Sequence, residues 1–229
     1  MRWLTKFLSS NIGLKILMAL TGAVMIGFVT MHMVGNLQVF LGAEPLDRYG
    51  SLLQGLGELL WLARLVLVTV LTVHVTAALV LTFRSLRARP IRYSRRKWFA
   101  TSLASRTMIY GGVALILFLG VHLAHLTLGW IHPDFTHCHL GELGRLECEV
   151  YANVVLGFQV WWMDLFYVVG MVFLGLHLAH GAWSLFRTLG LESARWDAVI
   201  HPLAIALGLA IGLGNSLIPL AVLFGVVGL

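Results

Sequence analysis

The chain alternates between long apolar stretches and shorter polar segments. Five of the apolar stretches are long enough to cross about 30 Å of hydrocarbon as helices, and they cover residues 14–40, 59–83, 107–130, 161–186 and 203–227. Because lipid offers no partners to backbone N–H and C=O groups, each stretch is expected to be helical throughout. The pattern predicts an all-α membrane protein, a single domain over residues 1–229, with its termini on opposite sides of the membrane.

Composition and charge give this fold an orientation. Of the 229 residues, 59% are hydrophobic and only 11% are charged, which is far more apolar than a soluble domain. Lysine and arginine gather before the first stretch, between the second and third, and after the fourth. The positive-inside rule then predicts a cytoplasmic N-terminus and an external C-terminus. Since topology accounts for the formal net charge of +6, nucleic acid is not an expected partner.

Both cysteines, Cys138 and Cys148, lie in the predicted outer segment between the third and fourth stretches. An external compartment permits a disulfide, so we expect these two residues to close this segment. A metal site that includes the nearby histidines is the alternative, although their spacing matches no standard site. The sequence has no CxxCH motif, so nothing points to covalently attached haem.

The two halves of the chain repeat a pair of helices. The first and third stretches each carry a glycine ten residues before a histidine, and the second and fourth each carry a histidine ten residues before an arginine. The four corresponding histidines are His32, His122, His74 and His177. The motif HLAH occurs at residues 122–125 and 177–180, but its second histidine, His125 or His180, has no counterpart in the other half.

Ionisable side chains inside hydrocarbon are costly and usually functional. The helical rise puts His74 and His177 about 14 Å from the cytoplasmic ends of their helices, and His32 and His122 about 22–27 Å above the starts of theirs. Histidines that face each other at one level can ligate the iron of a planar macrocycle from both sides, and such an iron carries electrons. We therefore predict two stacked b-type haems inside the first four helices, with a fifth helix for packing.

Small residues near the four histidines are expected to give the haem rings room, and glycines give the fifth helix a packing face. The candidates for ring room are Gly35, Ala77, Ala78, Gly120, Gly175 and Gly181, and those for packing are Gly208 and Gly212. Asn215 and Pro219 suggest an irregularity in the fifth helix.

Four stretches are specific in combination. They are SSNIGLKILMALTG leading to HMVGNLQVF, YGSLLQGLGELLWLARL leading to His74, Ser102 and Arg106 leading to Gly112 and His122, and HLAHGAWSLF. With them the chain resembles, over nearly its whole length, the cytochrome b membrane anchor subunit of succinate:quinone oxidoreductases (succinate dehydrogenase and fumarate reductase), in the class with five helices and two haems. Members of that family take axial ligands from the first four helices, at positions that match His32, His74, His122 and His177, and pair helix 1 with 3 and helix 2 with 4.

The resemblance implies a respiratory complex in the bacterial cytoplasmic membrane. A flavoprotein subunit would oxidise succinate or reduce fumarate, and an iron–sulfur subunit would pass electrons to this anchor at its basic cytoplasmic surface. A quinone would then exchange two electrons and two protons, and by analogy menaquinone is expected rather than ubiquinone. The chain would be an enzyme only as part of this complex, whose direction and higher-order oligomeric state stay open.

Several basic residues near the inner haem level could pair with its propionates, because a buried carboxylate needs a charged partner. They are Arg106, Lys15, Arg84 and Arg187. Positive-inside anchoring explains them equally well. Arg106 is the foremost candidate, since it recurs with Ser102 in the family pattern.

Five further residues could assist the haems or the quinone. His125 and His180 lie one turn beyond predicted ligands and could bond a haem edge, a propionate or a quinone carbonyl, or else be satisfied core histidines. Asp47, Glu58 and Asp164 stand near the outer ends of predicted helices, where a carboxyl could supply quinone protons or simply lie at the interface.

Three other functions are open to a histidine-rich membrane protein. A dihaem anchor of a hydrogenase or formate dehydrogenase would meet its catalytic partners outside, whereas the basic surface predicted here is inside. A membrane di-iron hydroxylase needs roughly eight histidine and carboxylate ligands clustered at the cytosolic rim. A metal-ion transporter needs acidic or thiol ligands within its spans.

Overall fold

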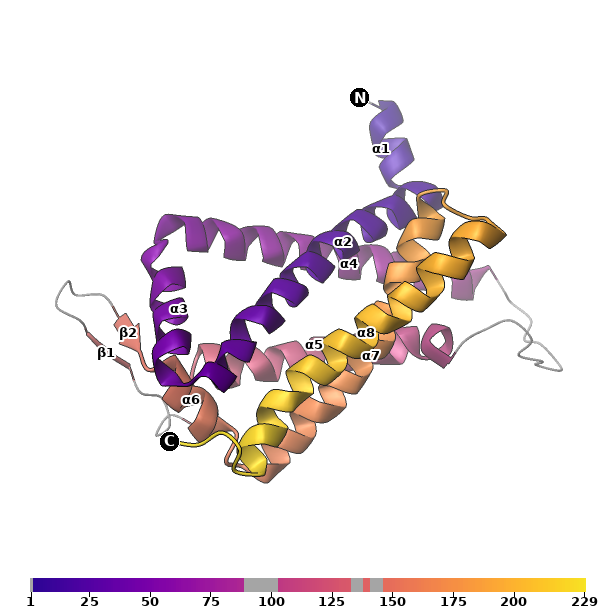
Figure 1. Cartoon of the computed structure of the whole chain (residues 1–229). Helices are drawn as coiled ribbons and strands as arrows, with labels where there is room; N and C mark the ends of the chain where they lie inside the picture. The colour runs from indigo at the N-terminus through magenta and orange to yellow at the C-terminus, as the bar shows by residue number, and fades with distance from the viewer. Residues whose placement is uncertain (1, 89–102, 133–137, 141–145) are drawn as a thin grey trace.

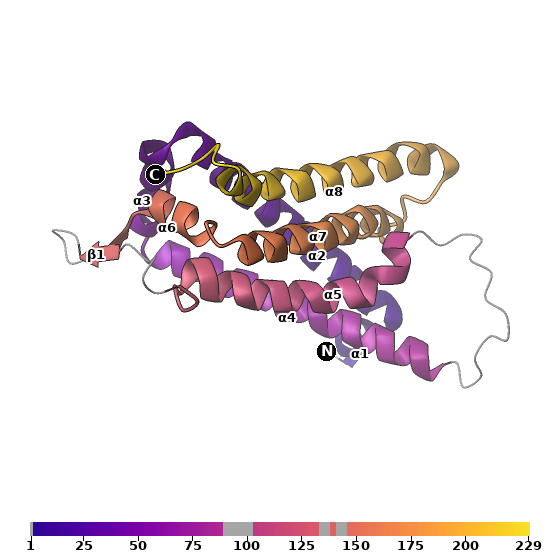
Figure 2. The same ribbon diagram turned by 90° about the horizontal axis from the view of Figure 1, so that it is seen from below.

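The computed structural model describes residues 2–88, 103–132, 138–140 and 146–229. Its helical elements are α1 (Arg2–Leu8), α2 (Asn11–Asn36), η1 (Leu37–Leu41), α3 (Ala43–Gly55), α4 (Glu58–Arg87), α5 (Leu103–His122), η2 (Leu123–Thr127), α6 (Val150–Gly157), α7 (Trp161–Thr188) and α8 (Ala194–Leu223). Two short strands, β1 (Cys138–Leu140) and β2 (Leu146–Cys148), pair in antiparallel fashion. Figure 1 shows the five long helices running between two ends of the molecule, and Figure 2 shows them from below.

The five long helices confirm the predicted spans. In the part of the chain that the structure describes, five segments are long and apolar enough to cross a bilayer, at Asn11–Leu41, Glu58–Arg87, Ala104–Thr127, Trp161–Thr188 and Ala194–Leu223. The chain is therefore an all-α, multi-pass membrane protein.

The last helix departs from its prediction. It begins at Ala194 rather than near residue 203, because Ser193 caps it by accepting a hydrogen bond from the Trp196 N–H, and it continues unbroken through Pro202 and Pro219. The irregularity suggested by Asn215 and Pro219 does not interrupt the helix, and the Asn215 side-chain amide donates to the Ile211 carbonyl at 2.9 Å, one turn back along the helix.

The short elements gather at one end of the molecule. α3, α6, the β1–β2 pair and the C-terminus lie together there, while α1 and the α7–α8 connection lie at the other end (Figures 1 and 2). α3 turns away from α2 at Gly42 (φ 100°) and from α4 at Gly57 (φ 53°), both in a region that favours glycine. The strand register sets Cys138 opposite Cys148, and the disulfide between them stays a prediction.

Helices α7 and α8 pack closely along glycines, as the sequence predicted for Gly208 and Gly212. A Cβ added at Gly212 would lie 3.1 Å from the Met171 carbonyl oxygen, and one at Gly208 would lie 3.0 Å from the Cβ of Ala179. Gly175 belongs to the same contact, since its added Cβ would lie 2.9 Å from the Gly208 oxygen. The suggestion that Gly175 gives a haem room is therefore wrong, because α8 already fills that side.

The hydrophobic core sits at the end that holds α3 and α6. Its buried members come from η1, α3, α6, α7, α8 and the C-terminal segment, and they are Val39, Leu46, Val155, Phe158, Met163, Tyr167, Ile218, Ala221, Val222 and Val227. Elsewhere large apolar side chains face outward along the long helices, as expected where lipid is the solvent. One end of the helical bundle is thus packed by protein on more sides than the other.

Candidate functional site: two facing histidine pairs

The four histidines selected by the repeat meet as two pairs. His32 of α2 and His122 of α5 have ring centroids 5.8 Å apart, with an angle of 89° between the ring planes. His74 of α4 and His177 of α7 have centroids 6.3 Å apart at 56°. Each pair joins one helix of the first half to one of the second, in the combinations that the sequence predicted.

These separations fit two imidazoles that share one metal ion. With a metal–nitrogen bond of about 2.0–2.1 Å and the ring centre about 1 Å further on, two opposite ligands place their centroids about 6 Å apart. Neither pair is stacked face to face, so the rings of each pair can direct nitrogens towards a common point. The donor set suits a bis-histidine iron in haem.

The two pairs lie at different levels along the helices. On α2, a Cβ added at Gly22 would lie 3.4 Å from the ring of His74, and Gly22 precedes His32 by ten residues. On α7, Tyr167 contacts His122 and precedes His177 by ten residues. Both helices therefore give a separation of about 15 Å, at a rise of about 1.5 Å per residue.

We call His74 with His177 the inner pair and His32 with His122 the outer pair. In the inner pair, residues of α2 determine the tautomer of His74. Its Nδ1 lies 3.1 Å from the Met18 carbonyl oxygen and 3.1 Å from the Thr21 hydroxyl. A carbonyl oxygen only accepts hydrogen bonds, so Nδ1 carries the proton and Nε2 keeps its lone pair. An imidazole whose Nδ1–H is held in this way is oriented as a metal ligand through Nε2.

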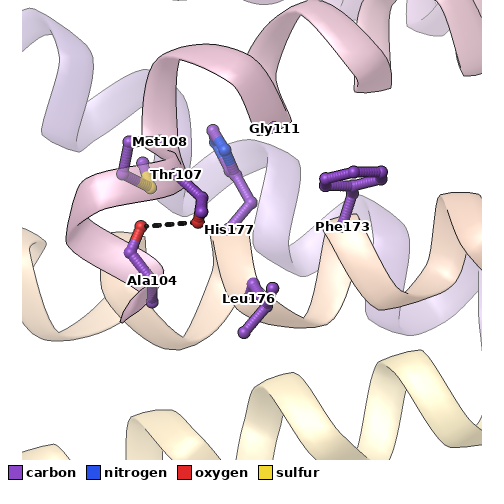
Figure 3. A pocket seen from close by; sticks show the side chains of 7 residues that line it. All are labelled: Ala104, Thr107, Met108, Gly111, Phe173, Leu176 and His177. Atoms are coloured by element: carbon purple, nitrogen blue, oxygen red, sulfur yellow. Dashed lines mark hydrogen bonds between the residues drawn. The ribbon is translucent and has the colours of Figure 1, made fainter. Parts of the chain in front are cut away.

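His177, the other inner histidine, lies beside a small pocket between α5 and α7. Figure 3 shows its ring among residues of both helices, together with the bond from the Thr107 hydroxyl to the Ala104 carbonyl. The pocket's empty space of about 160 Å³ is partly open to the surface and leaves no enclosed room for a water molecule. It is a notch beside the ring and is too small for a macrocycle. The Nδ1 of His177 is buried and has no hydrogen-bond partner in the described part of the chain.

The outer pair is enclosed by aromatic side chains. Phe28 stacks on His32 with centroids 5.4 Å apart, and Phe118 stacks on His122 at 5.8 Å. The hydroxyl of Tyr167, a residue only 6% exposed, lies 3.3 Å from the Nδ1 of His122. Sequence reasoning missed Tyr167, although a polar-tipped aromatic ten residues before His177 stands at the level of the outer pair.

The second histidines of the HLAH motifs belong to neither pair. His125 is buried, with its Nδ1 3.0 Å from the Tyr167 hydroxyl, and a Cβ added at Gly157 would lie 2.8 Å from its Nε2. His180 lies against Trp183, with ring centroids 6.0 Å apart, and its buried Nδ1 has no hydrogen-bond partner. His125 therefore reaches the outer pair through Tyr167, and His180 remains one turn from His177.

Arg84 and Arg187 each contact another segment of the protein. Arg84 donates to the Ser9 carbonyl and to Asn11 Oδ1, both at 2.9 Å, which ties the end of α4 to the start of α2. Arg187 pairs with Glu192 and lies over the Trp183 ring. Lys15 and Arg106 are exposed on α2 and α5, and a propionate role for either stays a prediction.

The three carboxylates have different surroundings. Asp47 accepts a hydrogen bond from the Tyr151 N–H at 2.8 Å, so it joins α3 to α6, and Glu58 is exposed at the start of α4. Asp164 is only 1% exposed, and neither of its oxygens has a hydrogen-bond partner among the residues that the structure describes. A buried polar group without partners requires an explanation, which makes Asp164 the functional candidate among the three.

The small residues expected to give the haem rings room have different surroundings. A Cβ at Gly35 would lie 2.6 Å from the Tyr49 ring, so Gly35 makes space for α3 rather than for a haem. No atom lies within 4 Å of a Cβ added at Gly120 or Gly181. For these two positions, the role that the sequence suggested, room for a haem ring, stays a prediction.

Comparison with known protein families, with curated proteins and with solved structures finds no match to this chain. Its function is therefore argued from the histidine pairs and the residues that support them.

Proposed function

We propose that this chain is the membrane anchor and electron-transfer subunit of a succinate:quinone oxidoreductase and holds two haems b. The observation that carries the proposal is the pair of facing histidine couples, with centroids 5.8 and 6.3 Å apart, at two levels of one helical bundle. When bound, the two haems would supply a path for single electrons between the levels.

The protein's contribution would be to supply two imidazoles to each haem. His32 with His122, and His74 with His177, would hold the two groups, and a haem held by two histidines carries electrons rather than binding oxygen. The helices that carry them are rigid, and the Met18 carbonyl holds His74 in the tautomer that a ligand needs. Pre-oriented ligands lower the cost of binding and of changing redox state.

The distribution of charge supports a cytoplasmic dock for the partner subunits. Basic residues of the described chain that lie towards the end with α1 and the α7–α8 connection are Arg2, Lys6, Lys15, Arg84, Arg87, Arg106, Arg187 and Arg195. The positive-inside rule puts this end in the cytoplasm of a bacterium. An iron–sulfur subunit with its flavoprotein would dock there, next to the level of His74 and His177.

Quinone chemistry belongs at the opposite end, near the outer pair. Asp164 is the carboxyl that we propose for proton exchange with menaquinone, because it is buried near the start of α7 and keeps both oxygens unengaged. Such a group can give or take a proton where water is scarce.

Replacing Asp164 with asparagine keeps the shape of the side chain, so Asp164→Asn should leave haem content unchanged and lower quinone turnover about 10²-fold or more. Unchanged turnover would remove Asp164 from the quinone site.

The separation of the two histidine pairs along the helices also distinguishes some of the competing functions. A di-iron hydroxylase would need its ligands gathered in one cluster, whereas these histidines form couples about 15 Å apart by the helical rise. A hydrogenase or formate dehydrogenase anchor would use similar couples, and only the side of the dock separates it from the proposal.

Purification from its native membrane tests the proposed function. The chain should carry with it a flavin-containing subunit and an iron–sulfur subunit, and succinate should reduce a menaquinone analogue through the complex. His201→Ala, a change of an exposed histidine on α8, should leave this activity intact, whereas His122→Ala should abolish it. A complex that oxidises hydrogen or formate instead of succinate would overturn the assignment.

A further inference from the structure

We propose that Tyr167 is a positioning residue that orients His122 and connects it to His125, so that the outer pair is tuned by a side-chain hydroxyl. This inference rests on the proposed function, because it requires that His122 ligate an iron. No feature of the sequence assigned Tyr167 a role.

The geometry places one hydroxyl between two histidines. The Tyr167 oxygen lies 3.3 Å from the Nδ1 of His122 and 3.0 Å from the Nδ1 of His125. All three residues lie at the packed end of the bundle, where Tyr167 is 6% exposed and also contacts Phe118 and Phe158 at centroid distances of 5.2 and 4.8 Å. The aromatic contacts hold the phenol ring and so fix where its oxygen stands.

If His122 binds iron through Nε2, one direction of hydrogen bonding follows. A His122 that binds iron through Nε2 carries its proton on Nδ1, so it donates to the Tyr167 oxygen. The Tyr167 O–H then donates to the Nδ1 of His125, whose Nε2 lies close to Gly157. The ligand form of His122 is compatible with this series, in which the Nε2 of His125 has no hydrogen-bond partner among the described residues.

The same contacts could belong to a tyrosine that merely satisfies its own hydroxyl in the core. His125 alone would be enough for that purpose, at the shorter distance of 3.0 Å. A purely structural role does not explain why the Tyr167 hydroxyl also lies close to His122. A positioning role also has consequences that packing lacks, because it changes the electronic properties of a ligand.

An acceptor for the Nδ1–H makes an axial imidazole more basic, which favours the oxidised iron. Because the Tyr167 O–H is itself donated to His125, its oxygen becomes a better acceptor. Removing the hydroxyl should therefore raise the reduction potential of the outer haem. The inner haem should not respond, because His74 bonds the backbone carbonyl of Met18.

Tyr167→Phe in the intact complex tests this, with the two haems followed separately by optical redox titration. We expect about a tenfold rise in the ratio of reduced to oxidised outer haem at a fixed potential, equal to about +59 mV for a one-electron couple, and no change in the inner haem. Tyr151→Phe is the matched control, since the Tyr151 hydroxyl bonds the Gly228 carbonyl at 2.9 Å, away from both pairs. It should leave both potentials unchanged.

His125→Ala supplies a second measurement should Tyr167→Phe fail to keep its outer haem. It leaves the Tyr167 hydroxyl in place and should shift the outer potential in the same direction by about threefold or less, because the oxygen loses only its cooperative strengthening. Unchanged potentials in Tyr167→Phe, or equal shifts of both haems, would overturn the inference and leave the proposed function standing. A native chain that binds no haem would overturn both.

Discussion

Each histidine pair joins two positions that correspond in the sequence repeat, but the outer and inner pairs differ in what supports them. His122 meets the hydroxyl of Tyr167 from another helix, whereas His74 meets the backbone carbonyl of Met18 and the hydroxyl of Thr21 on α2. The outer pair also has stacked aromatic neighbours, and His177 of the inner pair lies beside a small open notch. The repeat therefore determines where the four histidines lie, and packing against other residues determines what surrounds each pair.

This difference in hydrogen-bond partners determines how each pair can be altered by mutation. A backbone carbonyl cannot be removed by substitution, so the inner pair is set by the fold of α2 itself. A side-chain hydroxyl can be changed by a single mutation, so the properties of the outer pair, nearer the proposed quinone end, can be adjusted independently. Two haems with different potentials are the expected consequence.

Loss of a ligand should have the largest effect and should separate the two pairs. His122→Ala is expected to leave one haem per chain with the properties of the inner site, and His177→Ala to leave one with those of the outer site, because a single imidazole cannot hold a bis-histidine haem. Haem quantification with reduced-minus-oxidised spectra measures this. His125→Ala and His180→Ala should each retain two haems, and the loss of one from either would mean that the ligand assignment is wrong.

Filling the space beside His74 should selectively damage the inner pair. A Cβ at Gly22 already lies 3.4 Å from the His74 ring, so the longer side chain of Gly22→Leu must displace that ring. We expect the inner haem to be lost or strongly depleted, with the outer haem kept. Gly27→Leu on the same helix is the matched control, since an added Cβ there meets no atom within 4 Å. Equal depletion of both haems in Gly22→Leu would argue against separate sites.

Removing the Thr21 hydroxyl should have the smallest effect. Thr21→Val deletes one contact to the Nδ1 of His74 and leaves the Met18 carbonyl as its acceptor, so the inner haem should change its reduced-to-oxidised ratio by about threefold or less. Thr69→Val is the control, because the Thr69 hydroxyl bonds only the Leu65 carbonyl on an exposed part of α4. A shift as large as that expected for Tyr167→Phe would show that the hydroxyl, rather than the carbonyl, orients His74.

Much of this arrangement could be predicted from sequence because it depends on local rules. Apolar length predicts the spans, and the spacing of glycine, histidine and arginine predicts which histidines face each other. The α7–α8 contact through Gly208 and Gly212 followed from the small-residue pattern.

Other features depend on contacts between distant residues. Tyr167 is separated from His122 by 45 positions, and nothing local distinguishes it from an interfacial tyrosine. Likewise Asp47 and Asp164 look alike in the sequence, but one bonds α6 while the other is buried without partners. Gly35 and Gly175 were misassigned because a glycine shows only that something comes close, not whether that neighbour is a haem or another helix.

The most direct test is to count haem in the purified native chain and record its low-temperature electron paramagnetic resonance spectrum. Two low-spin haems b per chain, each with two imidazole ligands and with resolvable potentials, are the predicted result. One haem per chain, high-spin iron, or no haem at all would contradict the assignment of the two histidine couples as ligands.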